Sequence, residues 1–126
     1  MARQPGDELH ASTETIGHPD PDRTSEPGDV VTIDSDGNAT PAGDGDELFG
    51  VRSRNRQTRN VASIHHDGTT VAKVADGVGA GDGLGTSDEP GELEVEAGGP
   101  AVALSDEGGN YRGASIPDGY AAILLR

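Results

Sequence analysis

The sequence predicts an all-β fold: a small barrel or sandwich of seven to eight short strands, preceded by an extended N-terminal arm. Three observations support this prediction. Short β-branched or apolar runs recur every 8 to 15 residues, clusters of Gly, Asp and Asn separate them, and no stretch has a convincing helical period. With 126 residues the chain is one domain at most. We divide it into an arm at residues 1–28 and a β-rich domain at residues 29–126.

The arm has the composition of a tail. It contains four prolines, and only Leu9 and Ile16 are large and apolar. A segment this poor in apolar side chains cannot fill a core, so we expect it to be extended and ordered by a partner. The candidate contact residues are Leu9, Ile16, Pro19 and Pro21.

The β-rich domain shows its strands as short apolar runs. The Asp-Gly pair within 34–38 predicts a hairpin turn, and a second turn is expected at 66–68. Residues 92–96 alternate between acidic and apolar, so Leu93 and Val95 are expected to face inward. The glycine-rich stretch 77–85 predicts a turn or bulge leading into a strand. The expected strands are 30–33, 47–51, 61–65, 69–75, 92–96, 101–104 and 120–125.

Composition and charge limit the classes of partner. Acidic residues outnumber basic ones 23 to 9, for a net charge of −14. This balance argues against nucleic acid, whose phosphates need clustered Lys and Arg. No run approaches the ~18 apolar residues of a helical membrane span, so we expect no membrane partner. High acidity with small apolar side chains is typical of proteins from extreme halophiles, because molar salt shortens the Debye length to about 3 Å. Disorder is the alternative interpretation, which the strand pattern disfavours beyond the arm.

The motifs for metal and phosphate binding are incomplete. The glycines of 77–85 have a spacing of two, which fits no phosphate-binding loop. Asp34, Asp36 and Asn38 have the spacing of a calcium loop, but Gly45 occupies the position of the bidentate glutamate. Asn38 also begins a sequon for N-glycosylation. We therefore predict no cofactor and no metal site.

Catalytic motifs are equally sparse. His65 and His66 are adjacent, and on a strand they point to opposite faces. The chain has no cysteine and no G-x-S-x-G elbow. No pair of carboxylates lies in an apolar context that would raise a pKa for acid catalysis. We therefore expect that the protein is not an enzyme.

One cluster of charge is unusual. Arg52, Arg54, Arg56 and Arg59 carry four of the nine positive charges within eight residues. A spacing of two places the first three on one face of an extended segment. Because guanidinium groups match carboxylates bidentately, we predict an interface with an acidic chain. A solvated hairpin tip is the alternative, and nucleic acid is a third.

The order of the motifs resembles a known family. Residues 78–84 (VGAGDGL), 91–95 (GELEV), 101–104 (AVAL) and 119–125 (GYAAILL) follow one another as in the small β-rich head decoration proteins of tailed viruses. These include capsid-stabilising proteins similar to that of phage lambda. The resemblance covers residues 28–126, and the segments 52–59 and 108–117 depart from it.

This resemblance implies a β-tulip-like domain on the outer surface of an icosahedral capsid. The expected partners are the major capsid protein, on which the arm would lie, and two further copies in a homotrimer at three-fold or quasi-three-fold positions. The protein would be made in the host cytoplasm and stabilise the virion of a haloarchaeal virus. Because the core is small, trimerisation would bury more apolar surface, and Ile123, Leu124 and Leu125 are candidate interface residues.

Two other functions stay open at this point. Biotinyl or lipoyl carrier domains also use G-D-x-L turns, but their modified lysine sits at a hairpin tip, whereas Lys73 is expected within a strand. An adhesive module at the host surface would need exposed aromatic residues, for which Tyr111 and Tyr120 are thin support.

Overall fold

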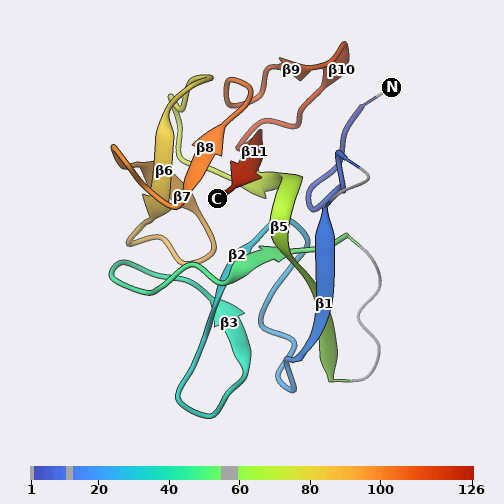
Figure 1. Cartoon of the computed structure of the whole chain (residues 1–126), viewed down its shortest axis with the longest axis vertical. Helices are drawn as coiled ribbons and strands as arrows, with labels where there is room; N and C mark the ends of the chain where they lie inside the picture. Colours follow the sequence, from blue (N-terminus) through green and yellow to red (C-terminus); the bar gives the residue numbers. More distant parts are fainter. Residues whose placement is uncertain (1, 11–12, 55–59) are drawn as a thin grey trace.

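The chain folds into β-strands and connecting loops (Figure 1). The computed structural model describes residues 2–10, 13–54 and 60–126, and in these ranges it contains eleven strands and no helix. The predicted all-β class is confirmed, with more strands than the seven or eight expected. The strands are β1 (Glu14–Pro19), β2 (Val30–Ile33), β3 (Ala39–Pro41), β4 (Gly50–Arg52), β5 (Val61–Lys73), β6 (Gly83–Thr86), β7 (Leu93–Val95), β8 (Ala101–Ala103), β9 (Asn110–Tyr111), β10 (Ala114–Ser115) and β11 (Tyr120–Leu125).

Nine of the strands form one curled, antiparallel sheet. Its order is β3-β2-β4-β5-β11-β8-β6-β7, with β1 paired to β5 off this path. The strands β9 and β10 form a separate hairpin. The predicted turn after β2 is confirmed, because Asp34 donates its amide to the carbonyl of Asn38 and Gly37 has a φ of 83°. β3 ends at Pro41, and a proline is tolerated there because β3 is an edge strand.

The longest strand, β5, joins the two halves of the sheet (Figure 1). It runs unbroken from Val61 to Lys73, so the hairpin turn predicted at 66–68 is wrong. Gly68 has a φ of 93°, and the register shifts where Asp67 pairs with Glu14. A glycine with positive φ serves a β-bulge as well as a hairpin. Here β4 pairs with the first half of β5 and β11 with the second, so the strand bends and continues.

Residues 2–10, which we call the N-terminal segment, approach β5 in an antiparallel orientation. The amides of Gly6 and Leu9 donate to the carbonyls of Val71 and Thr69, at 2.8 and 3.1 Å. Strand β1 continues this pairing along the first half of β5, as far as Val61. The chain's own sheet therefore orders a segment that was expected to need an external partner. Main-chain pairing needs a free strand edge but does not need apolar side chains. The composition of this segment therefore could not reveal its pairing with β5.

The core consists of three small clusters. The largest packs Leu84, Leu93 and Ile123 between the two halves of the sheet, and the second centres on Ile64. The third contains Val71, Ile116 and Ala122, and half-buried Leu9 packs against it. Leu93 is buried as predicted, but the prediction for Val95 is wrong, because its side chain is 57% exposed. β7 is the last strand of the sheet path; its outer edge is bridged to Val74 at Leu93, and Val95 lies beyond that bridge.

Candidate functional site

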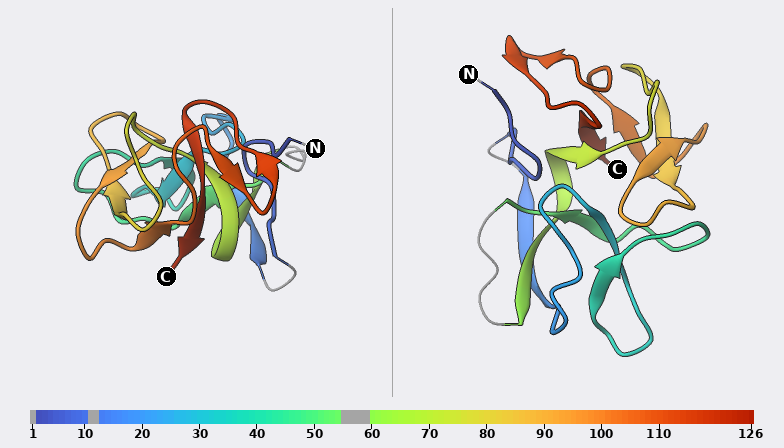
Figure 2. Two further views of the ribbon diagram at one scale, coloured as in Figure 1. Left: turned by 90° about the horizontal axis from the view of Figure 1, so that it is seen from above. Right: turned by 180° about the vertical axis from the view of Figure 1, so that it is seen from behind.

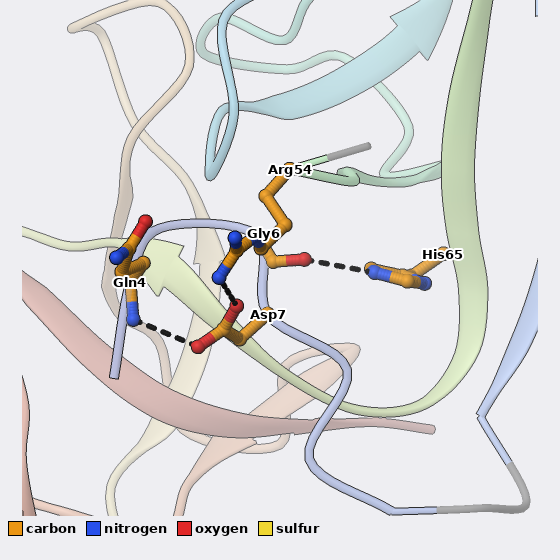
Figure 3. A network of polar contacts seen from close by, with 5 residues as sticks. All are labelled: Gln4, Gly6, Asp7, Arg54 and His65. Carbon is orange, nitrogen blue, oxygen red and sulfur yellow. Dashed lines mark hydrogen bonds and ion pairs between the residues drawn. The ribbon is translucent and has the colours of Figure 1, made fainter. Parts of the chain in front are cut away.

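The N-terminal segment is fastened to β5 by one buried side chain (Figure 3). His65 is 1% exposed, and its Nε2 lies 2.9 Å from the carbonyl oxygen of Gly6. A carbonyl can only accept, so Nε2 carries the proton and Nδ1 accepts from the hydroxyl of Thr15 at 2.7 Å. His65 thus holds both the beginning of the segment and β1. His66, its neighbour, is exposed and lies 3.5 Å from a carboxylate oxygen of Glu14.

Arg54 fixes the turn that precedes this contact. Its Nη1 lies 3.0 Å from Oδ1 of Asp7, while Oδ2 of Asp7 accepts the amide of Gln4 at 2.8 Å (Figure 3). The amide of Arg54 donates to the carbonyl of Gly6, so side chain and backbone of Arg54 both contact the segment. The arginine side chain remains 51% exposed, whereas that of Asp7 is 16% exposed.

Arg52 occupies a different environment. It is 5% exposed and donates from Nη1 to the carbonyl of Ser53. Burial lowers the pKa of Arg52, and the nearby carboxylates of Asp20 and Asp29 offset part of this effect. Arg52 and Arg54 were predicted to share one face, but Arg52 is buried, whereas Arg54 is half-exposed and contacts the N-terminal segment. Arg56 and Arg59 lie outside the described residues.

One buried carboxylate, Asp20, and one half-buried carboxylate, Asp29, lie near Arg52. Asp20 is 1% exposed and accepts hydrogen bonds from Thr24 and Ser25, the shortest at 2.7 Å from the hydroxyl of Ser25. Burial raises the pKa of Asp29, even though the amide of Glu26 donates to its carboxylate at 2.9 Å. These contacts close the loop between β1 and β2.

The four candidate residues of the arm separate into two groups. Leu9 packs onto the chain's own core. Ile16 is 43% exposed on β1, Pro19 is exposed at its end, and Pro21 is exposed in the following loop. Ile16, Pro19 and Pro21 therefore remain accessible, whereas Leu9 is half-buried against the core.

Two of the three candidate interface residues of the C-terminal strand, Ile123 and Leu125, lie inside the molecule. β11 pairs with β5 on one side and β8 on the other. Ile123 is fully buried, Leu125 is 6% exposed, and Leu124 is half-buried. We expected this strand to form a subunit interface. Instead, the side chains of Ile123 and Leu125 belong to the core of the single chain.

A hollow that the sequence did not predict lies between the N-terminal segment and the turn from β9 to β10. Arg3, Arg54 and Arg112 line it together with Asp7. Arg3 and Arg112 are too far apart in the sequence for any motif to connect them. The one available signal is the scarcity of basic residues, nine in 126.

The other motifs form turns and surface contacts. Oδ1 of Asp34 accepts the amides of Asp36 and Asn38, which stabilises the turn itself. Among the described residues, no group of three or more His, Asp or Glu side chains could hold a metal ion. The same residues include no helix of the length and apolar character that a membrane crossing requires.

Neither the models of known protein families nor the curated proteins include a match to this chain.

Proposed function

We propose that this chain is a structural virion protein that binds the outer surface of an icosahedral capsid and stabilises it. The four motifs that carry the resemblance to head decoration proteins support this proposal, because they occupy consecutive parts of one half-sheet. The first leads into β6, and the others coincide with β7, β8 and β11. The four strands follow one another in the sheet, in the order β11, β8, β6 and β7.

The observation that carries the proposal is the free outer edge of β1. Among the described residues, β1 pairs with β5 alone, so its other edge presents unpaired amides and carbonyls. Residues 14–17 are exposed, and Ile16 places a large apolar side chain at this edge. An exposed strand edge can accept a strand from a partner, with main-chain hydrogen bonds for affinity and side chains for specificity. The expected partner is a segment of the major capsid protein.

Purified virus particles test the proposal. Particles isolated from cells that produce the protein should contain it in a fixed ratio to the major capsid protein, measured by quantitative mass spectrometry. Capsids stripped of the protein should bind it again in a density gradient. Absence from the particles would overturn the proposal.

A matched pair of variants tests the role of β1. Ile16→Glu adds a charge to the edge strand and should abolish co-sedimentation with capsids, while circular dichroism shows an intact fold. Thr40→Glu places the same charge on β3, an edge strand at one end of the sheet path, and should bind normally. Equal binding by both variants would contradict the role of β1.

The carrier function is not favoured by the position of Lys73. It is the last residue of β5 rather than the tip of a hairpin, and its amide donates to the carbonyl of Gly28 at 2.8 Å. The intact mass of the native protein tests this alternative, because biotin or lipoate on Lys73 would add a defined increment.

A further inference from the structure

The hollow lined by Arg3, Arg54 and Arg112 concentrates positive charge on a strongly acidic molecule. It holds three of the nine basic side chains, against 23 acidic residues in the whole chain. The N-terminal segment contributes Arg3, and the turn between β9 and β10 contributes Arg112. We call this hollow the arginine pocket.

The arginine pocket carries more positive than negative charge, since three arginines line it with one aspartate. Arg112 is exposed, has a φ of 49°, and lies 5.5 Å from the centre of the Tyr111 ring. Asp7 is the acidic residue of the lining, and it is already bound by Arg54 and by the amide of Gln4. Neither Arg3 nor Arg112 forms an ion pair with a described residue, so positive charge exceeds negative charge in the lining and the pocket is suited to an additional anion.

Guanidinium groups favour planar anions with two acceptor oxygens. In proteins, the carboxylates of Asp and Glu are anions of this kind. A single exposed ion pair contributes little, and salt screens it. Several guanidinium groups around one partly enclosed carboxylate retain directional hydrogen bonds under these conditions. The chemistry of the pocket thus fits an acidic side chain that enters from another protein surface.

The opposite side of the molecule carries such a surface. Figures 1 and 2 show the N-terminal end with the β9–β10 hairpin on one side, and β6 with β7 on the other. β7 is the terminal strand of the sheet path and bears Glu94 and the exposed Val95, with Glu92 before it and Glu96 after it. Burial raises the pKa of Glu92, the positive charge of Lys73 offsets part of this rise, and the nearby carboxylates of Glu89, Asp76 and Asp88 add to it. This edge combines exposed carboxylates with an exposed apolar side chain, and it begins at Leu93, which is bridged to Val74.

We propose that the arginine pocket of one copy binds the acidic β7 edge of a second copy, with the carboxylate of Glu94 as the principal ligand. The two surfaces differ, so the contact is head-to-tail, and repetition of a head-to-tail contact closes into a ring when the rotation permits. Elsewhere two copies repel each other, which makes this orientation selective. The inference deepens the proposed function, since it names the surfaces through which copies would meet on a capsid.

Charge reversal tests the contact in solution. Light scattering at several KCl concentrations should show self-association of the wild type, and Arg112→Glu should lower the association constant about tenfold or more. Arg23→Glu is the matched control, because Arg23 is also exposed, has a φ of 51° and lies outside the pocket. It should associate like the wild type. Adding Glu94→Arg to Arg112→Glu should restore association, since both sides of the contact are then reversed.

Four results would overturn the inference. They are a wild type that stays monomeric at high concentration, normal association of Arg112→Glu, equal loss in Arg23→Glu, and failure of the double variant to recover. Titration with inorganic phosphate tests whether the pocket instead binds free anions. Saturable phosphate binding at the pocket without any effect on self-association would show this and overturn the inference. Co-sedimentation with capsids is measured separately, so loss of capsid binding with intact self-association would reject the proposed function alone.

Discussion

The imidazole of His65 donates a hydrogen bond to the carbonyl of Gly6 across 2.9 Å, which ties the beginning of the chain to the middle of its longest strand. These residues are 59 positions apart. The same ring accepts from Thr15, so one buried side chain connects the N-terminal turn, β1 and β5. The segment that composition describes as a tail is an integral edge of the sheet.

Removing this imidazole should loosen the segment. His65→Ala leaves a buried carbonyl and a hydroxyl without their partner, at a cost of about 1–3 kcal/mol. We expect faster hydrogen exchange in residues 6–10 and 13–15 and a lower urea midpoint. His66→Ala is the control, because His66 is exposed and its imidazole lies beside the exposed carboxylate of Glu14. If the two variants exchange alike, His65 is not the fastening residue.

The bulge in β5 depends on Gly68. Its φ of 93° disfavours any other residue, and a Cβ atom there would lie 2.7 Å from Cα of Thr13. Gly37 has a φ of 83° but no atom within 4 Å of its Cβ position. Gly37→Ala should therefore cost only the backbone strain of about 1–2 kcal/mol. Gly68→Ala should cost a further 1–3 kcal/mol or so, because it also crowds the backbone of Thr13.

Urea unfolding of both variants in molar KCl measures this difference. Hydrogen exchange should place the additional loss of stability of Gly68→Ala in residues 6–10, in residues 13–15 and in β5. Equal destabilisation by the two substitutions would mean that Thr13 shifts without cost.

The raised pKa of Asp29 makes stability depend on pH. Because burial raises the folded-state pKa above the ordinary 3.8, the folded chain binds this proton more tightly than the unfolded chain. The resulting stabilisation is fully present below pH 3.8 and is lost as pH rises through the folded-state pKa. Asp29→Asn keeps an oxygen for the amide of Glu26 and cannot ionise. We expect its stability to match the wild type in acid and to exceed it at neutral pH.

Urea midpoints from pH 3 to pH 7.5, at constant ionic strength, check this prediction. Asp44→Asn removes the same charge from an exposed loop and controls for the change in net charge. A gain in Asp29→Asn that is no larger than that of Asp44→Asn would contradict a role for burial.

Salt should determine the stability of the isolated chain. A net charge of −14 on 126 residues repels itself in dilute buffer, and molar KCl screens that repulsion. We expect a cooperative thermal transition, followed by circular dichroism, whose midpoint rises between dilute and molar KCl. Sucrose at matched osmolality is the control, since it does not screen charge. A midpoint independent of KCl would refute the halophilic interpretation.

The sequence by itself determined the features that depend on neighbouring residues. The run at 30–33 coincides with β2, the strands expected at 101–104 and 120–125 correspond to β8 and β11, and the Asp-Gly turn follows β2. β-branched alternation and glycine turns act within a few residues, so they can be recognised without a fold. β9 and β10, of two residues each, have no such signal.

Only the tertiary structure decided what each segment pairs with. It made β5 continuous through Gly68, placed the N-terminal segment on its free edge, and buried Arg52 while leaving Val95 exposed. It also brought Arg3 and Arg112 to one pocket. The physical reason is that strand partners and burial depend on which edges and faces other parts of the chain leave uncovered. A pattern of side chains along one segment does not contain that information.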